Sequence, residues 1–306
     1  MKCLIYQLII RVKHLLFVDA FLYTYFKEEN KLIKTGLVNG AREHLQLVID
    51  HTVKENVDLP IKDFVILSLY NSITNKVFDI KLLLDNNQHD SIDIIVRTIF
   101  EQYVYLKYIL LSHTETKAKQ FYYSYKIQSA AKGKSIFINF VKNKELYGDL
   151  PALSKKGQEQ LGKMFPDEQD FDEDINKYLE MFKSNIRYEP HKKNKKFYEK
   201  WYKIDNNLNN LRDLVNLEKM DIYEAIYEVI YSFGSMSVHG IDVPGNIIPN
   251  DEVTILGKNI NESSNNTFVG VMLMDVSRKV TNHYKLNKND AIRSKLKKME
   301  LSYKYR

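Results

Sequence analysis

Chain breakers are scarce in this sequence, since its 306 residues include only 11 glycines and 6 prolines. Tight turns rely on glycine for a positive φ angle and on proline for a fixed one, so a β-sandwich or a doubly wound sheet of this length would need many more of both. Long helices joined by short loops need few. We therefore predict an all-α fold, a multi-helix bundle with an inserted loop-rich segment and at most a minor β element.

Apolar residues recur with helical spacing along most of the chain. This periodicity predicts helices at about residues 3–27, 29–55, 60–86, 91–112, 116–144, 208–215, 221–238, 266–284 and 289–302. Gly36 and Gly40 weaken the second of these helices, because glycine is a poor helix former. A short strand is predicted from Val253 to Leu256.

Prolines and charge runs set residues 148–200 apart, where we expect short helices and loops. The predicted organisation has three parts. Residues 1–147 supply the N-terminal helices and the centre of the bundle, 148–200 form a variable charged insertion, and 201–306 supply helices that complete the same core.

The single cysteine, Cys3, has no partner for an intramolecular disulfide, which indicates a reducing compartment and predicts a cytoplasmic protein. The apolar stretch 4–26 raises the question of a membrane span. Arg11, Lys13 and Asp19 lie in its middle, and each charge costs about 2.5–3.5 kcal/mol at the centre of a bilayer. We predict no membrane span and interpret the stretch as an amphipathic helix packed on the protein, with contact at a membrane surface as the alternative.

The net charge of +6 is concentrated near the end of the sequence. Residues 285–306 contain eight lysines or arginines and two acidic residues, a net of 8 − 2 = +6, so the other 284 residues are neutral overall, with 37 basic and 37 acidic side chains. RNA phosphates would bind such a segment, and a solvated terminal helix would explain it equally well.

The predicted helix at 91–111 carries the most informative polar pattern. Asp93, Arg97 and Glu101 fall on one stripe, while large apolar residues, Tyr108 among them, surround that stripe and cover the opposite side. A helix that is apolar on every side belongs in the centre of a bundle. Arg97 and Glu101 are then either an ion pair that orients this helix or a pair that faces a cleft and binds or polarises a ligand.

A second segment, YSFGSMSVHG, places Tyr231, Ser235 and His239 at i, i+4 and i+8 on one helix stripe. His239 would either cap the C-terminus of this helix, where the helix dipole favours its protonated form, or act as a general acid or base beside the charged pair of the first segment. An imidazole suits proton transfer because it titrates near neutrality.

Three separated segments resemble an uncharacterised bacterial family of helical domains: DSIDIIVRTIFEQYVYLKYIL, the Trp201 segment leading into LRDLV, and IYEAIYEVIYSFGSMSVHG. In that family an R-x-x-x-E helix, a tryptophan segment and a helix ending in S-x-x-x-H-G follow in this order. The matching positions are Arg97, Glu101, Trp201, Ser235 and His239. The family is similar in style to abortive-infection proteins and, distantly, to HEPN-type ribonuclease toxins.

This resemblance implies a cytoplasmic effector of abortive-infection or stress type, with metal-independent RNA cleavage as the finer prediction. HEPN-type toxins use an arginine and a histidine on one helix, but no arginine precedes His239 in its helix, so Arg97 would have to reach it in space. His239 would then move the 2′-hydroxyl proton, Arg97 would stabilise the phosphorane charge, and Glu101 would orient the arginine. The supporting residues would be Asp93, Tyr108, Trp201, Tyr231 and Ser235.

The alternative function is a non-catalytic helical module for interaction or sensing, in which Arg97, Glu101 and His239 form a structural network. The sequence has no phosphate-cradling glycine loop, hydrolase elbow or metal-ligand spacing, so no cofactor and no metal are predicted. The predicted partners are RNA, a second copy of the chain bound through its aromatic-rich helices, and a neutralising or sensor protein.

Overall fold

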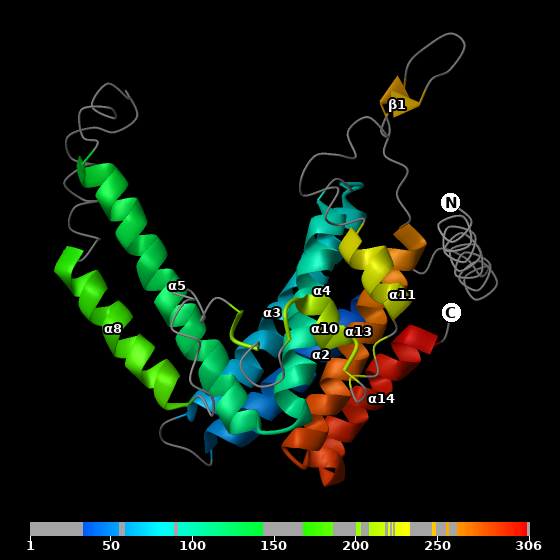
Figure 1. Ribbon diagram of the computed structural model, residues 1–306. Coiled ribbons are helices and arrows are strands. Elements are labelled where there is room, and N and C mark those ends of the chain that lie inside the picture. The colour runs from blue at the N-terminus through cyan, green and yellow to red at the C-terminus, as the bar shows by residue number, and fades with distance from the viewer. Residues whose placement is uncertain are drawn as a thin grey trace, which may run out of the picture. The chain divides into compact units, whose positions relative to one another are not determined.

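The computed structural model of the chain describes residues 33–54, 59–88, 91–142, 168–185, 200–202, 208–217, 220, 222, 224–232, 247–248, 255–256 and 262–304. Its helices are α2 (Thr35–Lys54), α3 (Ile61–Asp85), α4 (Ile92–Leu111), α5 (Thr114–Lys142), α8 (Glu168–Ser184), α10 (Leu211–Val215), α11 (Glu224–Tyr227), the π-helical turn η2 (Glu228–Ser232), α13 (Glu262–His283), the 3-10 turn η4 (Leu286–Lys288) and α14 (Asp290–Lys304) (Figure 1). Within these described ranges the strands are the two-residue β1 (Ile247–Ile248) and β2 (Ile255–Leu256), which pair antiparallel. The predicted all-α fold with a minor β element is therefore confirmed.

Several predicted helices lie close to the observed ones. α3 begins directly after Pro60, and the backbone N–H of Phe64 donates to the Pro60 carbonyl at 2.9 Å, which closes the first turn. α4 follows Ser91, whose side chain makes no capping hydrogen bond. Part of the predicted insertion forms the 17-residue helix α8, which is longer than the short helices expected there. The predicted helix at 3–27 lies outside the described residues.

By its internal contacts the chain divides into two compact units. The first unit takes its residues from Met1–Leu59, Ile66–Ser112 and Leu211–Arg306, and the second from Pro60–Val65 and His113–Asn210. The predicted three-part organisation stays a prediction. None of the helices in the described ranges is both long enough and apolar enough to cross a membrane.

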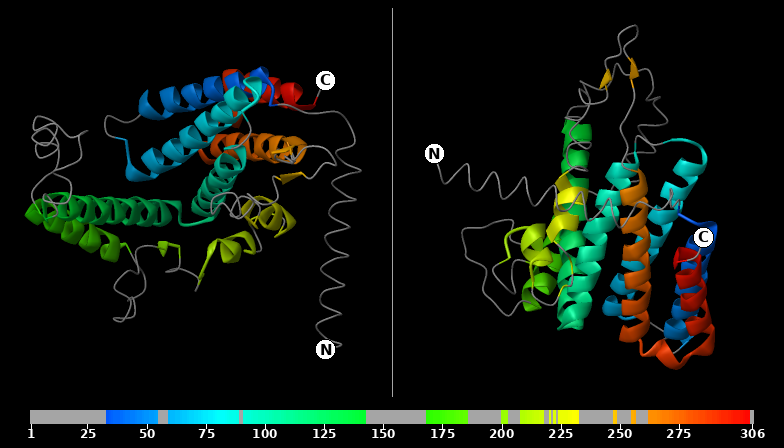
Figure 2. Two further views of the ribbon diagram at one scale, coloured as in Figure 1. Left: turned by 90° about the horizontal axis from the view of Figure 1, so that it is seen from above. Right: turned by 90° about the vertical axis from the view of Figure 1, so that its right-hand side faces the viewer.

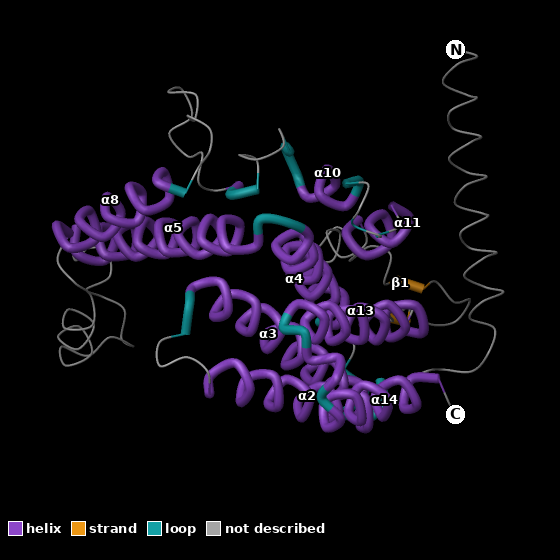
Figure 3. Tube along the Cα trace, turned by 90° about the horizontal axis from the view of Figure 1, so that it is seen from below, coloured by secondary structure: helices purple, strands orange, loops and turns teal. Residues whose placement is uncertain are grey.

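The first unit is built from helices that pack along one another. α14 lies alongside α2, and α13 lies beside α4 (Figures 1, 2 and 3). Large apolar side chains from these helices form the core, and burying one of them stabilises the fold by about 1.5–3 kcal/mol. This packing fixes the position of α4 in the first unit. The fully buried apolar residues include Ile66, Ile73, Val77, Ile80, Ile99, Phe100, Leu106, Val269, Leu273, Val280, Ile292 and Met299.

Two glycines explain how closely α14 approaches α2. A Cβ atom on Gly36 would lie 2.6 Å from Ser302 Oγ, and one on Gly40 would lie 2.6 Å from Met299 Cγ. Both distances are shorter than an ordinary van der Waals contact of 3.4–4 Å. Glycine inside a helix costs about 1 kcal/mol relative to alanine. The predicted weakening of α2 is thus accompanied by a closer fit between the two helices.

The second unit contains an antiparallel helix pair, α5 and α8 (Figures 1 and 3). The register runs in opposite directions along the two helices, since Gly133 lies against Phe171 while Tyr123 stacks on Tyr178 with 6.4 Å between ring centroids. α5 carries six lysines and one glutamate, whereas α8 carries six acidic residues and two lysines. These opposite net charges favour the pairing.

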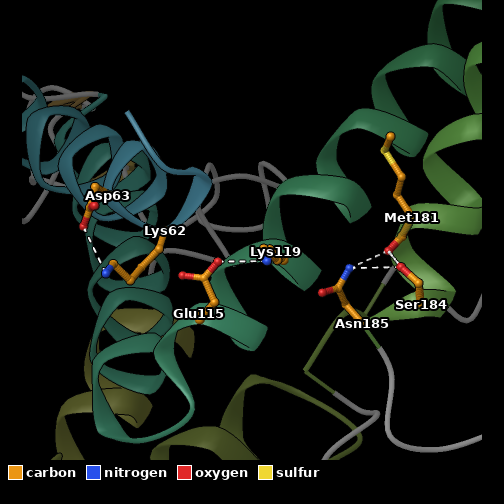
Figure 4. A network of polar contacts seen from close by, with 7 residues as sticks. All are labelled: Lys62, Asp63, Glu115, Lys119, Met181, Ser184 and Asn185. Atoms are coloured by element: carbon orange, nitrogen blue, oxygen red, sulfur yellow. Dashed lines mark hydrogen bonds and ion pairs between the residues drawn. The ribbon is translucent and has the colours of Figure 1, made fainter. Parts of the chain in front are cut away.

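Local polar contacts secure helix ends in this second unit (Figure 4). Within α5, Lys119 forms an ion pair with Glu115 at 2.9 Å. At the end of α8, the Asn185 side chain donates to the Met181 carbonyl at 2.7 Å. The last carbonyls of a helix have no partner inside the helix, so this contact satisfies one of them.

Candidate functional site

α4 places the arginine and the glutamate of the R-x-x-x-E pattern one turn apart. Arg97 Nε donates to Glu101 Oε1 at 3.3 Å, because residues at i and i+4 share one face of a helix. Their side chains are 18% and 31% exposed, so water reaches the pair. Asp93, one turn earlier, is half-buried. The expected burial of α4 on every side is wrong for its N-terminal half, where Ile94 is 40% exposed.

A tyrosine from far along the chain is the second hydrogen-bond partner of Arg97. Arg97 Nη2 donates to the Tyr231 hydroxyl at 3.2 Å, and the guanidinium carbon lies 4.4 Å from the centroid of the Tyr231 ring. A guanidinium within about 6 Å of an aromatic face is attracted by the ring quadrupole. Folding of the first unit therefore brings Arg97, Glu101 and Tyr231 together, although the tyrosine is 134 residues away from the arginine in sequence.

The Tyr231 ring belongs to a longer stack. The centroids of the Tyr231 and Tyr227 rings are 5.0 Å apart, with an angle of 12° between the ring planes. On the other side of the stack, the Arg212 guanidinium carbon lies 5.8 Å from the centroid of the Tyr227 ring. Tyr231 sits on the π-helical turn η2, a rare widening of the helix that often occurs at functional sites. Burial raises the pKa of Tyr227, and the neighbouring Tyr231 adds to this effect. We call Arg97, Glu101, Tyr231, Tyr227 and Arg212 the Arg97 network.

Glutamates hold the arginine at each end of this stack. Arg212 pairs with Glu224 and, at 2.8 Å, with Glu228, and its hydrogen bond to Glu224 raises the pKa of Arg212. Arg97 bonds through Nε and Nη2 only, so among the described residues its Nη1 group has no hydrogen-bond partner. A guanidinium has five N–H donors in a planar fork. Glu101 and Tyr231 therefore orient one edge of the Arg97 guanidinium, and its remaining N–H groups could donate to an anion.

The other predicted site residues lie apart from this network or outside the described residues. Tyr108 is fully buried in the first unit. Trp201 is buried in the second unit, where its ring meets Phe121 edge-on at 5.4 Å between centroids. Ser235 and His239 lie outside the described residues. The predicted meeting of Arg97 with His239 thus stays a prediction.

Sequence analysis missed a second polar cluster, which connects α2, α3 and α13. His44 Nδ1 lies 2.9 Å from the Tyr70 hydroxyl, and His44 Nε2 lies 2.8 Å from the Thr281 hydroxyl. The Tyr70 hydroxyl is 2.7 Å from Ser277 Oγ. The Ser277 and Thr281 hydroxyls also lie 2.8 Å from the backbone carbonyls of Leu273 and Ser277. We call His44, Tyr70, Ser277 and Thr281 the His44 network, and all four are completely buried.

A count of protons shows which form of His44 this network favours. It contains five contacts, and each needs one proton. Three hydroxyls and a neutral imidazole supply four, whereas an imidazolium would supply the fifth. The contact left without a proton involves a helix carbonyl that already accepts from the backbone N–H four residues later, so its loss costs about 1 kcal/mol or less. Burying a charge costs several kcal/mol.

The neutral imidazole is therefore favoured over the imidazolium, and burial lowers the pKa of His44 to about 4. Burial also raises the pKa of the Tyr70 hydroxyl, so both groups are neutral around pH 7.

One sequence signal could have located the His44 network. Ser277 and Thr281 are small polar residues spaced i, i+4 on the apolar face of a predicted helix, a position that requires a polar partner.

A buried lysine joins α4 to α13 at a third polar contact, also missed from the sequence. Lys107 Nζ lies 3.3 Å from Asp275 Oδ2 and donates to the Tyr103 hydroxyl at 3.3 Å. Tyr103 in turn donates to Asp275 Oδ2 at 2.8 Å. A buried ammonium group is stable only where a carboxylate and hydrogen bonds offset the loss of its hydration. We therefore assign this contact a structural role in joining α4 to α13.

No group of three or more His, Cys, Asp or Glu side chains within the described ranges is arranged to hold a metal ion. The neighbours of His44 are hydroxyls, which are not the ligands that a zinc site collects around an imidazole. The described chemistry consists of a partly exposed guanidinium, its carboxylate and hydroxyl partners, and two buried polar clusters.

The described residues form an all-α fold that holds a partly exposed network of Arg97, Glu101 and Tyr231. The family that its sequence matches is described as a family of unknown function (DUF5677), and the match covers residues 63–243, more than half of the chain. The chain belongs to this family, which confirms the predicted membership of an uncharacterised family. The matched range includes Arg97, Glu101 and His239. No curated protein and no solved structure matches the chain.

Proposed function

We propose that this protein is a cytoplasmic effector of abortive-infection or stress type that cleaves RNA, with Arg97 as the group that stabilises the charge on the phosphate. The observation that supports this proposal is the unused Nη1 edge of Arg97 in a side chain that is 18% exposed. A guanidinium held in position before an anion arrives loses little freedom on binding, and its planar fork matches two phosphate oxygens.

The proposed step is a transfer within the RNA. The 2′-oxygen of one nucleotide forms a bond to the adjacent phosphorus, and the bond from that phosphorus to the 5′-oxygen of the next nucleotide breaks. A general base takes the 2′-hydroxyl proton, and a general acid gives a proton to the 5′-oxygen that leaves. His239 is the candidate for both roles through the family resemblance, because a neutral imidazole accepts a proton and an imidazolium donates one.

The partners of Arg97 would act as positioning residues in this mechanism. Glu101 holds Nε and Tyr231 holds Nη2, so the guanidinium plane cannot turn freely. The π-helical turn that carries Tyr231 precedes the segment of Ser235 and His239 by only a few residues. A change in this turn would therefore alter the arginine and the proposed acid or base together.

The test is induced expression of the wild type and of Arg97→Ala, Arg97→Lys and His239→Ala, with growth and bulk RNA integrity followed over time. Wild type is expected to slow growth and degrade RNA, and both alanine variants are expected to lose these effects. The matched control is Arg212→Ala, which removes the arginine at the other end of the same stack. Unchanged growth with intact RNA in every strain would remove the nuclease proposal.

A second candidate function is a non-catalytic module for interaction or sensing, and a specific observation favours it. Each arginine of the Arg97 network already has a carboxylate partner and an aromatic face, an arrangement that also serves to hold helices together. Under this function Arg97→Ala and Arg212→Ala would behave alike in the growth test. A neutralising partner protein and a homodimer belong to either function as proposals.

A further inference from the structure

The positive charge of the chain has a defined place in the first unit. Residues 285–306 carry the whole net charge of +6, and residues 285–304 form the end of the α13–η4 connection, η4 and α14. α14 lies alongside α2 (Figures 1 and 2). Ile292 and Met299 of α14 are fully buried, so this helix uses its apolar face for the core and presents its polar face outward.

Arginines and one lysine already neutralise the nearby carboxylates. Asp290 pairs with Arg293 at 2.8 Å, and Glu300 pairs with Arg278 of α13. On α2, Glu43 pairs with Lys295, and this contact lowers the pKa of the Glu43 carboxyl. Both acidic residues of residues 285–304 are therefore occupied, and they do not neutralise the remaining lysines.

Four exposed lysines remain, which we call the C-terminal lysine surface: Lys285, Lys288, Lys297 and Lys298. Within the described part of the chain none of them forms an ion pair at contact distance, and Lys298 interacts with Glu43 only through the longer-range field. Lys285 and Lys288 flank Leu286, which is buried and anchors η4. The turn therefore presents these two ammonium groups from a fixed backbone.

A phosphate polymer fits this surface better than a membrane does. An amphipathic helix binds a bilayer by inserting its apolar face, but the apolar face of α14 is covered by the first unit. Lysine ammonium groups bind phosphates as point charges and do not select a base. Binding of this kind gains its free energy from release of the counterions that surround the nucleic acid.

We propose that the C-terminal lysine surface binds the phosphate backbone of RNA without base specificity. This activity goes beyond RNA cleavage and does not require it, because the lysines are separate from the Arg97 network in sequence and in their contacts. RNA captured in this way could be a substrate, or it could be a ligand that recruits the protein.

The test is fluorescence anisotropy of the full chain with a labelled single-stranded 2′-O-methyl RNA, which cannot be cleaved through its 2′-oxygen. The variant Lys288→Gln/Lys297→Gln is compared with Lys132→Gln/Lys177→Gln, which removes two exposed lysines from the second unit. The first pair is expected to weaken binding roughly tenfold and to reduce the slope of log K against log salt by about 1 per lysine. The second pair is expected to bind like wild type.

Three outcomes would overturn the proposal: equal weakening by the two double variants, no binding by the wild type at low salt, or binding to phosphatidylserine vesicles in place of RNA. Thermal melts of both variants should match the wild type, because all four lysines are exposed. The Lys288→Gln/Lys297→Gln change should weaken RNA binding by the same factor in the Arg97→Ala background as in the wild type, because the two sites share no contact. Loss of RNA cleavage in cells by Arg97→Ala with an unchanged effect of the lysine pair in vitro, or the reverse, would separate the two proposals.

Discussion

The His44 network and the Arg97 network, both in the first unit, differ in the burial and in the charge of their polar groups. The His44 network is completely buried, consists of neutral groups, and leaves its imidazole no carboxylate partner among the described residues. The Arg97 network is partly exposed and pairs each guanidinium with a carboxylate. Water and counter-charge permit ionisation in the second place, while their absence in the first keeps the imidazole neutral.

This difference also separates stability from function. A buried neutral cluster is worth most when every member is present, because a lost partner leaves a polar atom without water or protein to bind. A half-exposed charged pair contributes little to the free energy of unfolding, since water competes for both groups. We therefore expect the two networks to respond very differently to substitution.

The largest effect is expected from Tyr70→Ala. This change removes a completely buried ring and the hydroxyl that joins His44 to Ser277, so the free energy of unfolding should fall by about 3–5 kcal/mol. Tyr70→Phe, which keeps the ring, should cost about 1–2 kcal/mol. The control is Tyr125→Ala, whose side chain is 61% exposed and should change stability by less than about 0.5 kcal/mol. Denaturant titrations in which all three variants lose equal stability would contradict this ranking.

The second-largest effect is expected on the free energy of unfolding when the pH is lowered. The pKa of His44 is about 4 in the folded protein, against an ordinary value of 6.5, so the unfolded chain binds the proton more readily. Falling pH therefore favours unfolding, beginning near 6.5 and ending near 4, and the full difference amounts to about 3 kcal/mol. Above pH 6.5 this contribution to stability is fully present.

Other groups titrate in the same range, so the measurement is a difference between two proteins. His44→Gln keeps a donor and an acceptor but does not titrate. Unfolding free energies of wild type and His44→Gln are compared at several pH values between 4 and 7. The wild type should lose more stability than the variant as the pH falls. Parallel curves would show that His44 is not the group responsible.

The smallest effect is expected at the Arg97 network. Arg97→Ala removes one partly exposed ion pair, one hydrogen bond and one cation–π contact, and should cost about 1 kcal/mol. Glu101→Gln should cost about 0.5 kcal/mol. Melting curves at low and high salt measure both changes, and salt should reduce them. A loss above about 3 kcal/mol in Arg97→Ala would mean that this network carries the fold, and would favour the non-catalytic module.

Much of the fold followed from local patterns. The helix after Pro60 and the helix around Arg97 were predictable because their signals, a first-turn proline and a 3.6-residue apolar period, act over a few neighbouring residues. Gly36 and Gly40 show the limit of such reasoning. By propensity they only weaken α2, whereas their benefit depends on Ser302 and Met299, which lie more than 250 residues away in sequence.

The candidate site also combines contacts that local spacing predicts with contacts that depend on the tertiary structure. Arg97 and Glu101 could be paired from their i, i+4 spacing alone. Tyr231 was a supporting candidate, but its hydrogen bond to Arg97 and its stack on Tyr227 depend on how η2 packs on α4. The His44 network was missed altogether, because no contact between two of its side chains joins residues closer than 26 apart in sequence.

The sequence by itself determined the helices, the stripe that carries Arg97 and Glu101, and the basic character of the C-terminal segment. Each depends on spacing within a few turns or on a count of charges. Only the tertiary structure decided that Tyr231 binds Arg97, that the lysines of α14 face outward, and that His44 stays neutral. These properties depend on which surfaces lose their water, and that is set by contacts between residues that are distant in the chain.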